Sequence, residues 1–261
     1  MKKNLAILAL VFLALPVFGQ MATAPKPPQF YLIHEEIPRP QMLQQYESTT
    51  REFFNLLGEQ KVDPKVFNIT AFQTTDMHRL FVAAIPSFAG VDSIYQVFMT
   101  LGSGPAKDRF NDLMRRSNNT MYSYNEFVAV RRDDLSYVPA TPRLKPEESP
   151  FVHWQFFYLD GSRIQEAEQI AKDYGALFRS KNIGDGFTIY EQLSGNDLPV
   201  WVVASTARSA ADYYANDDKI TAALGSELRA LQARSMNVTR KYDVRDAMLR
   251  TDLAYPMPAS K

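Results

Sequence analysis

The stretch RLFVAAIPSFAGVDSIY (Arg79–Tyr95) returns in altered form as PVWVVASTARSAADYYA (Pro199–Ala215), at an offset of 120 residues. Directly upstream, FNITAFQ (Phe67–Gln73) aligns with FTIYEQL (Phe187–Leu193) at the same offset. Similar segments that recur in one order at one spacing are typical of an internal repeat. We therefore predict that the chain contains two copies of a unit of about 115 residues.

Two further segments frame the copies. The chain opens with MKKNLAILALVFLALPVFGQ, in which two lysines precede an apolar run and Gly19 offers a cleavage position. This layout is typical of a secretory signal and predicts export to the periplasm or the extracellular space; an uncleaved N-terminal anchor is the alternative. The segment VPATPRLKPEESP carries four prolines, which disfavour regular structure and suit a linker. The predicted organisation is a signal peptide at 1–20, a first repeat at 21–137, a linker at 138–150 and a second repeat at 151–261.

Hydrophobic periodicity predicts the same order of elements in both copies. Runs with strand character alternate with longer stretches whose apolar residues have helical spacing. In the first copy they are a strand at 29–37, a helix ending at Gly58, a hairpin at 66–85, a helix at 91–116 and a strand at 126–132. In the second copy they are a strand at 151–159, a helix at 162–180, a hairpin at 187–206, a helix at 210–235 and a strand at 242–250. Each copy is thus predicted as β-α-β-β-α-β.

This order is that of a ferredoxin-like unit, an antiparallel sheet with two helices on one face. Strand segments such as FVHWQFFYL (151–159) are apolar at odd and even positions alike, which favours a sheet covered on both faces. In element order and duplication the chain resembles the dimeric α+β barrel superfamily, which includes antibiotic-biosynthesis-monooxygenase-like, NIPSNAP-like and stress-responsive proteins. The resemblance implies an α+β fold in which two ferredoxin-like repeats pack sheet to sheet as one pseudo-symmetric barrel. A monomer would then imitate a dimer, and further oligomerisation stays open.

One short phrase is repeated at the end of the last predicted strand in each copy, as RRDDLSY (131–137) and LRTDLAY (249–255). The structural interpretation is a corner built twice, in which leucines pack, aspartates cap backbone N–H groups and each tyrosine buries its ring against its own repeat. The alternative is two related ligand sites, at which the arginines bind carboxylate or phosphate. The charged and aromatic residues of this corner motif are Arg132, Asp134, Tyr137, Arg250, Asp252 and Tyr255.

Composition excludes several classes of protein. The chain has no cysteine, so disulfides, thiolate nucleophiles, Cys-ligated zinc and a lipid-modified cysteine are excluded. Basic and acidic residues number 29 each without a long run of either sign, which gives no electrostatic basis for binding nucleic acid or an anionic membrane. No second apolar stretch of spanning length follows the signal, so we expect no stable membrane insertion after its removal.

No catalytic motif of known spacing is present. The sequence lacks a GxSxG nucleophile elbow, a GxGxxG fingerprint and a P-loop, and its three histidines show no metal-binding spacing. His78 falls in the predicted hairpin turn, where we expect it to be solvated. His34 and His153 fall on the first strands of the two copies, although the alignment places His34 opposite Phe156. A histidine in a strand is commonly a hydrogen-bonded core residue, but an imidazole lining the barrel could act as a base or bind haem.

Aromatic side chains are abundant on the strands of the second copy. One interpretation is a core, in which each large ring stabilises the fold by a few kcal/mol when buried. The sharper hypothesis is an apolar pocket between the sheet and the helices, with the few polar contacts that small-molecule sites use. Candidate lining residues are His34, His153, Trp154, Gln155, Tyr190 and Trp201. The adjoining Glu35 and Glu36 point to opposite faces of a strand, which argues against a cooperating acid and base.

The predicted function follows from the fold and this pocket. We expect an exported barrel protein that binds a small apolar or aromatic molecule in the barrel. The alternatives are a cofactor-independent oxygenase or haem-dependent enzyme, which the resemblance allows, and a structural or protein-interaction module, which a fully packed interior would favour. The sequence predicts no metal site and assigns neither a catalytic residue nor a cofactor.

Overall fold

The structure, a computed structural model, describes residues 29–256. The predicted signal segment at 1–20 lies outside these described residues. Within them, none of the helices combines the length and the apolar character that crossing a bilayer requires.

The two halves of the described chain share one order of strands and helices, except that two helices of the first half stand where the second half has one, and this order confirms the α+β prediction. The first half consists of β1 (Phe30–Pro38), α1 (Leu43–Glu59), β2 (Ile69–Thr74), β3 (Arg79–Ile85), α2 (Gly90–Ser103), α3 (Lys107–Thr120) and β4 (Met121–Arg131). The second half consists of β5 (Phe151–Leu159), α4 (Ile164–Ser180), β6 (Thr188–Gln192), β7 (Val200–Ala207), α5 (Ala210–Asn237) and β8 (Thr239–Leu249). That both halves descend from one duplicated unit stays an inference from the sequence.

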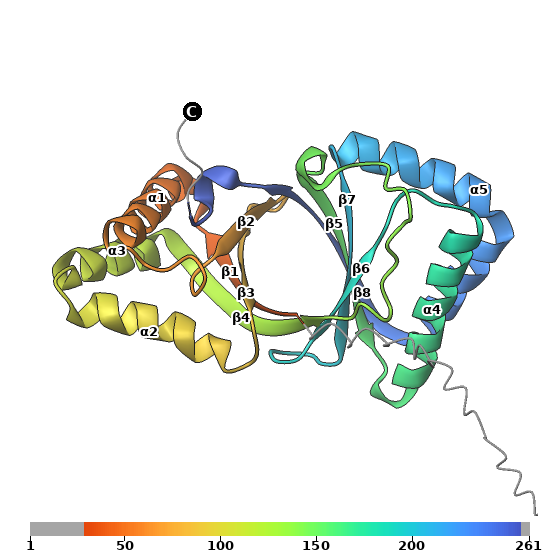
Figure 1. The fold of residues 1–261 in the computed structure, drawn as a ribbon, viewed down its shortest axis with the longest axis horizontal. Helices are drawn as coiled ribbons and strands as arrows, with labels where there is room; N and C mark the ends of the chain where they lie inside the picture. Colours follow the sequence, from red (N-terminus) through yellow and green to blue (C-terminus); the bar gives the residue numbers. More distant parts are fainter. Residues whose placement is uncertain (1–28, 257–261) are drawn as a thin grey trace, which may run out of the picture.

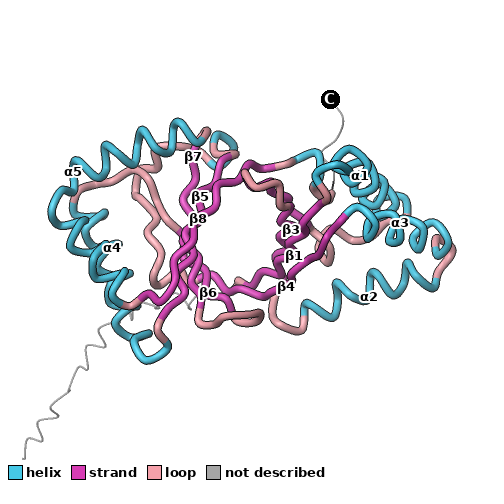
Figure 2. Tube along the Cα trace, turned by 180° about the vertical axis from the view of Figure 1, so that it is seen from behind, coloured by secondary structure: helices cyan, strands magenta, loops and turns pink. Residues whose placement is uncertain are grey.

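The eight strands close into one barrel, in the order β1-β3-β2-β8-β5-β7-β6-β4, and every neighbouring pair is antiparallel. Helices α1 to α3 lie outside the barrel on one side, and α4 and α5 lie outside it on the other (Figure 1). The view from behind shows the same arrangement (Figure 2). Two seams join the halves, because β2 pairs with β8 and β4 pairs with β6. Each half therefore completes its edges only by pairing with the other.

Both faces of the barrel wall are covered. Successive side chains of a strand point to opposite faces, so each strand contributes to a layer on either side of the wall. Leu32 of β1 belongs to the apolar layer between the wall and the helices of the first half, and its neighbour Ile33 to a cluster inside the barrel. In β5, Phe157 packs in the helix layer of the second half, whereas Trp154 packs inside the barrel. One buried interior and two buried helix layers explain why the strands are apolar at odd and even positions.

The register of the two halves corrects one predicted equivalence. In both β1 and β5 the pairing shifts between the eighth and ninth residues of the strand. Superposing these shifts places His34 opposite Gln155, and not opposite Phe156 as the alignment predicts. A shift of one residue turns a strand side chain to the other face. Phe156 accordingly lies in the cluster inside the barrel, while His34 lies on the helix side.

Glycine and proline interrupt the second helical region of each half. The helix predicted at 91–116 is two helices, α2 and α3, because Gly104 between them is extended (φ −88°, ψ −165°). Proline disfavours helical backbone in the residue that precedes it, which here is Gly104, and Pro105 itself has no N–H to donate. Helix α5 is kinked at Gly225, whose φ of 55° is a conformation that glycine adopts without a steric penalty.

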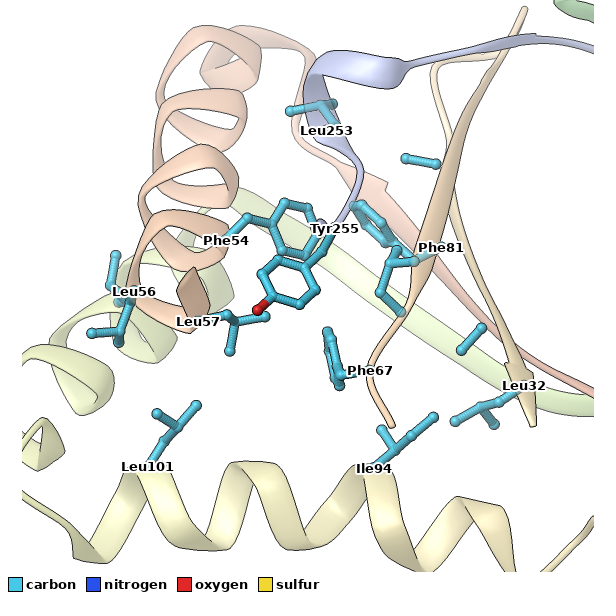
Figure 3. Close-up of a cluster of buried hydrophobic side chains, with 14 of the residues drawn as sticks. Leu32, Phe54, Leu56, Leu57, Phe67, Phe81, Ile94, Leu101, Leu253 and Tyr255 are labelled. Atoms are coloured by element: carbon cyan, nitrogen blue, oxygen red, sulfur yellow. The ribbon is translucent and has the colours of Figure 1, made fainter. Parts of the chain in front are cut away.

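The C-terminal corner of the chain enters the first half. Tyr255 packs against Phe54 and Phe67, and its hydroxyl donates to the carbonyl oxygen of Val62 at 2.7 Å. Leu253 is fully buried in the same layer. Figure 3 shows both side chains entering the first-half core from the C-terminal segment, between α1 and the barrel wall.

The corner that follows β4 enters the second half in the same way. Tyr137 packs against Phe178 and Phe187, and its hydroxyl donates to the carbonyl oxygen of Ile183 at 2.9 Å. Leu135 is buried beside it in the second-half layer. The prediction that each tyrosine buries against its own repeat is therefore wrong. Strands β4 and β8 run along the two seams, so the chain that follows each of them continues into the neighbouring half.

Candidate functional site

In each half, a cavity lies between the outer face of the barrel wall and the helices that cover it. The first cavity, of about 360 Å³, lies between strands β1, β3 and β4 and helices α1, α2 and α3. The second cavity, of about 340 Å³, lies between strands β5, β6 and β7 and helices α4 and α5. Two cavities in this fold thus match the predicted pocket between sheet and helices, and both lie outside the barrel interior.

Three ionisable side chains lie in a row in the first cavity. His34 of β1 lies between Glu36, two residues along the same strand, and Glu126, its pairing partner on β4. Its Nε2 is 3.2 Å from Glu36 Oε1, and its Nδ1 is 3.3 Å from Glu126 Oε2. Tyr46 of α1 donates its hydroxyl to the other oxygen of Glu36, and Tyr95 of α2 donates to the other oxygen of Glu126 at 2.6 Å. We call His34, Glu36 and Glu126 the ion chain.

Hydrogen bonds set the protonation of the ion chain. Burial alone acts to lower the pKa of His34, but the hydrogen bonds to Glu126 and Glu36 outweigh burial and raise the pKa to about 9. The hydrogen bond from His34 in turn lowers the pKa of Glu126. The hydroxyl of Tyr95 donates a hydrogen bond to the same carboxylate, and this bond raises the pKa of Tyr95 to about 12. At neutral pH the ion chain therefore contains an imidazolium between two carboxylates and carries one net negative charge.

The rest of the first cavity is mainly aromatic and apolar. Phe53 and Phe98 stack there with ring centroids 5.8 Å apart. Thr49 also lines this cavity; it is 2% exposed, and its hydroxyl has no hydrogen-bond partner among the described residues. Buried hydroxyl groups without a partner are uncommon, so this one suggests a group that a ligand could satisfy. Behind the cavity wall, the guanidinium of Arg79 is paired with Glu47 at 2.9 Å.

The second cavity lacks the ion chain. The strand positions that correspond to His34, Glu36 and Glu126 hold uncharged side chains. They are Gln155, Phe157 and Val244.

Other polar groups line the second cavity. The buried indole N–H of Trp201 has no hydrogen-bond partner among the described residues. Burial raises the pKa of Asp217 on α5. Arg143 of the linker lies at the rim, where it binds Asp185 at 2.7 Å and Asp212 at 2.8 Å. This cavity therefore contains the carboxylate of Asp217 and uncharged hydrogen-bonding groups but, among the described residues, no histidine between two carboxylates.

His153 lies beside the second cavity without lining it. Its Nδ1 is 2.7 Å from Asp246 Oδ1, and its ring stacks on Tyr213 with centroids 4.3 Å apart. The other oxygen of Asp246 accepts the hydroxyl of Tyr214 at 2.9 Å. His153 is thus a hydrogen-bonded core histidine, the first of the two interpretations that its position in a strand allowed.

His78 is not the solvated turn residue that the sequence predicts. Its side chain is 19% exposed, and Nδ1 lies 2.6 Å from Glu35 Oε1. Arg245 of β8 contacts the same oxygen at 2.6 Å, so this buried carboxylate joins the hairpin turn to β8. In residues 29–256, no group of three or more histidine, aspartate or glutamate side chains is arranged to hold a metal ion.

The six predicted pocket residues fall in four places. His34 lines the first cavity, whereas Gln155 and Trp201 line the second. Trp154 and Tyr190 belong to the cluster inside the barrel, and His153 lies beside the second cavity. They do not form one site, and their role as ligand contacts stays a prediction.

Sequence reasoning missed four members of the first site: Glu36, Tyr46, Tyr95 and Glu126. Glu36 and its neighbour do point to opposite faces, as predicted, and are not a pair. The available signal was the spacing of His34 and Glu36, which puts both on one face of a strand. Glu126 could not be found in this way, since its place opposite His34 depends on the pairing of β1 with β4.

The arginines of the corner motif are already bound by carboxylates. Arg132 forms a two-pronged pair with Asp134, at 3.0 and 2.9 Å, and contacts Glu168 and Glu191 of the second half at 2.8 Å each. Arg250 is held similarly in the first half. Its partners are Asp252, Glu47 and Gln73. These contacts fix the exchanged corners in place, and the structural role of the motif stays a prediction that the stability measurements below test.

No family model matches the sequence, and no curated protein matches it. Solved structures do. An anthrone oxidase-like protein is 11% identical over 87% of this chain and 92% of its own, with a TM-score of 0.53. A mutant chlorite dismutase from Candidatus Nitrospira defluvii is 9% identical over 85% of this chain and 91% of its own, with a TM-score of 0.52. A candidate monooxygenase from Lactobacillus acidophilus NCFM is 7% identical over 87% of this chain and 95% of its own, with a TM-score of 0.51. At such identities the likeness shows a shared ferredoxin-like α+β barrel fold and nothing further.

Proposed function

We propose that this chain binds a small molecule with an aromatic or otherwise apolar body in the first cavity. The observation that carries the proposal is a cavity of about 360 Å³ whose walls are mainly apolar and in which the ionised groups of the described residues form one cluster, the ion chain. Small-molecule sites combine an apolar surface of this size with a few fixed polar groups that orient the ligand. An interaction module without a ligand would be favoured by a fully packed interior, and two cavities of this size speak against it.

Binding can be tested with the neutral fluorescent probe N-phenyl-1-naphthylamine. We expect saturable binding to the wild-type chain and its loss in Ala83→Leu, because the added side chain extends from β3 into the first cavity. The matched control is Ser205→Leu, which fills the second cavity at the corresponding position of β7. Loss of binding in the control alone would move the site to the second cavity. No saturable binding by the wild-type chain would overturn the proposal.

A cofactor-independent oxygenase is the second candidate, favoured by the hydrogen-bonded histidine in the cavity and by the names of two structural neighbours. Such chemistry needs a base that generates an electron-rich anion from the substrate. The imidazole of His34 is protonated at neutral pH, and the ion chain already carries a negative charge. Both features oppose the formation of a substrate anion, so we place binding before oxygenation. Oxygen consumption on adding 1-naphthol, absent in His34→Gln, would reverse this order.

Haem, which the resemblance allows, does not fit the histidines. Both ring nitrogens of His34 are bound to carboxylates, and His78 lies between Glu35 and Asp76. His153 lines neither cavity and is covered by the ring of Tyr213. None of the three presents a free nitrogen to a cavity, and the proposed function includes no haem.

Export is a further part of the proposal and rests on the sequence at 1–20. We expect the chain recovered from a periplasmic or extracellular fraction to begin near Gln20. N-terminal sequencing measures this directly, and an intact Met1 in a soluble cytosolic fraction would contradict it.

A further inference from the structure

We propose that the first cavity selects a cation: a small amine with an aromatic or otherwise apolar body, whose ammonium group lies against the carboxylates of the ion chain. The inference rests on the proposed function and narrows its ligand class.

The charge of the lining carries the argument. The ionised groups that face the first cavity are His34, Glu36 and Glu126, and no arginine or lysine among residues 29–256 lines it. Arg79, near the ring of Tyr46, is already offset by its ion pair with Glu47. One negative charge of the ion chain is therefore uncompensated in surroundings of low polarity. A monocation that enters neutralises it, a neutral molecule leaves it unchanged, and an anion adds repulsion.

The carboxylates can accept further hydrogen bonds. Each oxygen of Glu36 and Glu126 has one partner in the structure, and a carboxylate has about four lone-pair sites in all. Their side chains are 13% and 28% exposed, so they are accessible from the cavity without being dispersed in bulk water. The buried hydroxyl of Thr49, which has no partner in the described chain, is an independent indication that a polar group of a ligand belongs here.

The walls suit a cation with an apolar body. Tyr124 and His34 lie ring to ring at 5.0 Å, so a positive charge already rests against an aromatic face in this cavity. Phe53, Phe98 and Tyr95 add further aromatic surface. Ammonium groups are attracted to the faces of such rings, and apolar bodies gain from contact with them.

The second cavity serves as an internal control. Gln155, Phe157 and Val244 occupy the positions of the ion chain, so the second cavity lacks an imidazolium between two carboxylates. The carboxylates of the described residues that line it are Asp185, which is paired with Arg143, and Asp217. We expect the preference of the first cavity for cations to persist when Ser205→Leu fills the second cavity.

Three ligands of similar shape separate charge from shape: 1-naphthylmethylamine, 1-naphthylmethanol and 1-naphthoate. Each is titrated against the wild-type chain by calorimetry near pH 7. We expect the amine to bind at least about tenfold more tightly than the alcohol, and the carboxylate to bind most weakly. Equal affinity of amine and alcohol, or tighter binding of the carboxylate, overturns the cation inference and leaves the proposed function intact. Failure of all three ligands and of the neutral probe overturns both.

Two variants test whether the preference comes from the ion chain. In Glu126→Gln and Glu36→Gln, which keep the size of the side chain, we expect the advantage of the amine over the alcohol to fall by about tenfold. A cooperative melting transition shows that each variant is folded. The control Ser205→Leu should retain the full preference. Retention of the preference in both glutamine variants would overturn the inference.

Discussion

The two cavities occupy the same place in the two halves and differ in chemistry. Both lie between the barrel wall and the helices, and their volumes are about 360 and 340 Å³. The first holds an imidazolium between two carboxylates, whereas the corresponding strand positions of the second hold an amide, a phenyl ring and a valine. The repeated architecture therefore fixes where a cavity forms, while individual side chains on the strands decide what it can bind.

The two halves are alike in another respect: the core of each half contains buried side chains from the corner that follows the last strand of the other. The first-half core contains Leu253 and Tyr255 from the C-terminal corner, and the second-half core contains Leu135 and Tyr137. The seams β2–β8 and β4–β6 add backbone pairing between the halves. The halves differ in their cavities but depend equally on this exchange.

Separating the halves should have the largest effect. A fragment of residues 21–140 loses both seams and the buried side chains of the C-terminal corner, so it exposes strand edges and part of its core. We expect it to aggregate or to self-dimerise when produced alone, as measured by size-exclusion chromatography with light scattering. Co-production with residues 141–261 should restore a soluble one-to-one complex. A monomeric fragment with a cooperative melting transition would refute the dependence.

Removing the corner rings should have the next largest effect. We expect Tyr137→Ala and Tyr255→Ala each to lower the free energy of unfolding by about 3–5 kcal/mol, the usual cost of deleting a buried aromatic ring. The Phe variants lose only the hydrogen bond to a backbone carbonyl and should cost about 1 kcal/mol. Urea unfolding measures all four.

Hydrogen exchange locates the damage and tests the exchange of corners. Because Tyr255 packs on α1, its removal should speed amide exchange in the first half, and removal of Tyr137 should do so in the second. Unchanged stability of both Ala variants would refute the structural role of the motif.

The fold was predictable because its signals are local and repeated. Periodicity placed most elements, and apolar residues on both strand faces indicated a sheet covered on each side. The exchange of corners was not predictable, since RRDDLSY and LRTDLAY reveal that a corner recurs but not which half it enters. That choice depends on the seam pairings of β4 and β8, which are contacts between distant parts of the chain.

The candidate site was predictable only where it is local. His34 could be proposed as a site residue, and its spacing from Glu36 was readable from the sequence. Its alignment with Phe156 was off by one residue, because the pairing shifts near the ends of β1 and β5 had no sequence signal. In a strand, that single residue decides which face a side chain occupies.

Charge in the first cavity should give a moderate, pH-dependent contribution to stability. The pKa of His34 is about 9, above its ordinary value of 6.5, so the protonated ion chain stabilises the folded state fully below pH 6.5. This contribution is lost as the pH rises through 9. We expect wild type to exceed His34→Gln in free energy of unfolding at pH 6, and the difference to shrink steadily up to pH 9.5.

Three groups near His34 keep one charge state through this window. Glu126 stays ionised because its pKa is lowered, and Tyr46 and Tyr95 stay neutral because their pKa values are raised. Gln155→His supplies the matched comparison, since Phe157 and Val244 stand where Glu36 and Glu126 flank His34, and Asp217 is the carboxylate that lines the cavity near it. NMR titration should find the pKa of the introduced imidazole below that of His34, which is near 9. Two similar values would remove the electrostatic contrast between the cavities.

The smallest effect concerns two adjacent threonines that line the first cavity. The buried hydroxyl of Thr49 has no partner in the described chain, whereas that of Thr50 donates to the carbonyl oxygen of Tyr46 at 3.0 Å. Valine keeps the shape of threonine, so Thr49→Val removes only an unsatisfied group and should leave the free energy of unfolding unchanged or raise it by up to about 1 kcal/mol. Thr50→Val loses a hydrogen bond and should lower the free energy of unfolding by about 1 kcal/mol.

If the unpartnered hydroxyl is kept for a ligand, Thr49→Val should also bind 1-naphthylmethylamine more weakly while it is no less stable. Urea unfolding and calorimetry on the same samples measure the two effects, and a Thr49→Val variant that is destabilised as much as Thr50→Val would show that the hydroxyl serves the fold and not a ligand.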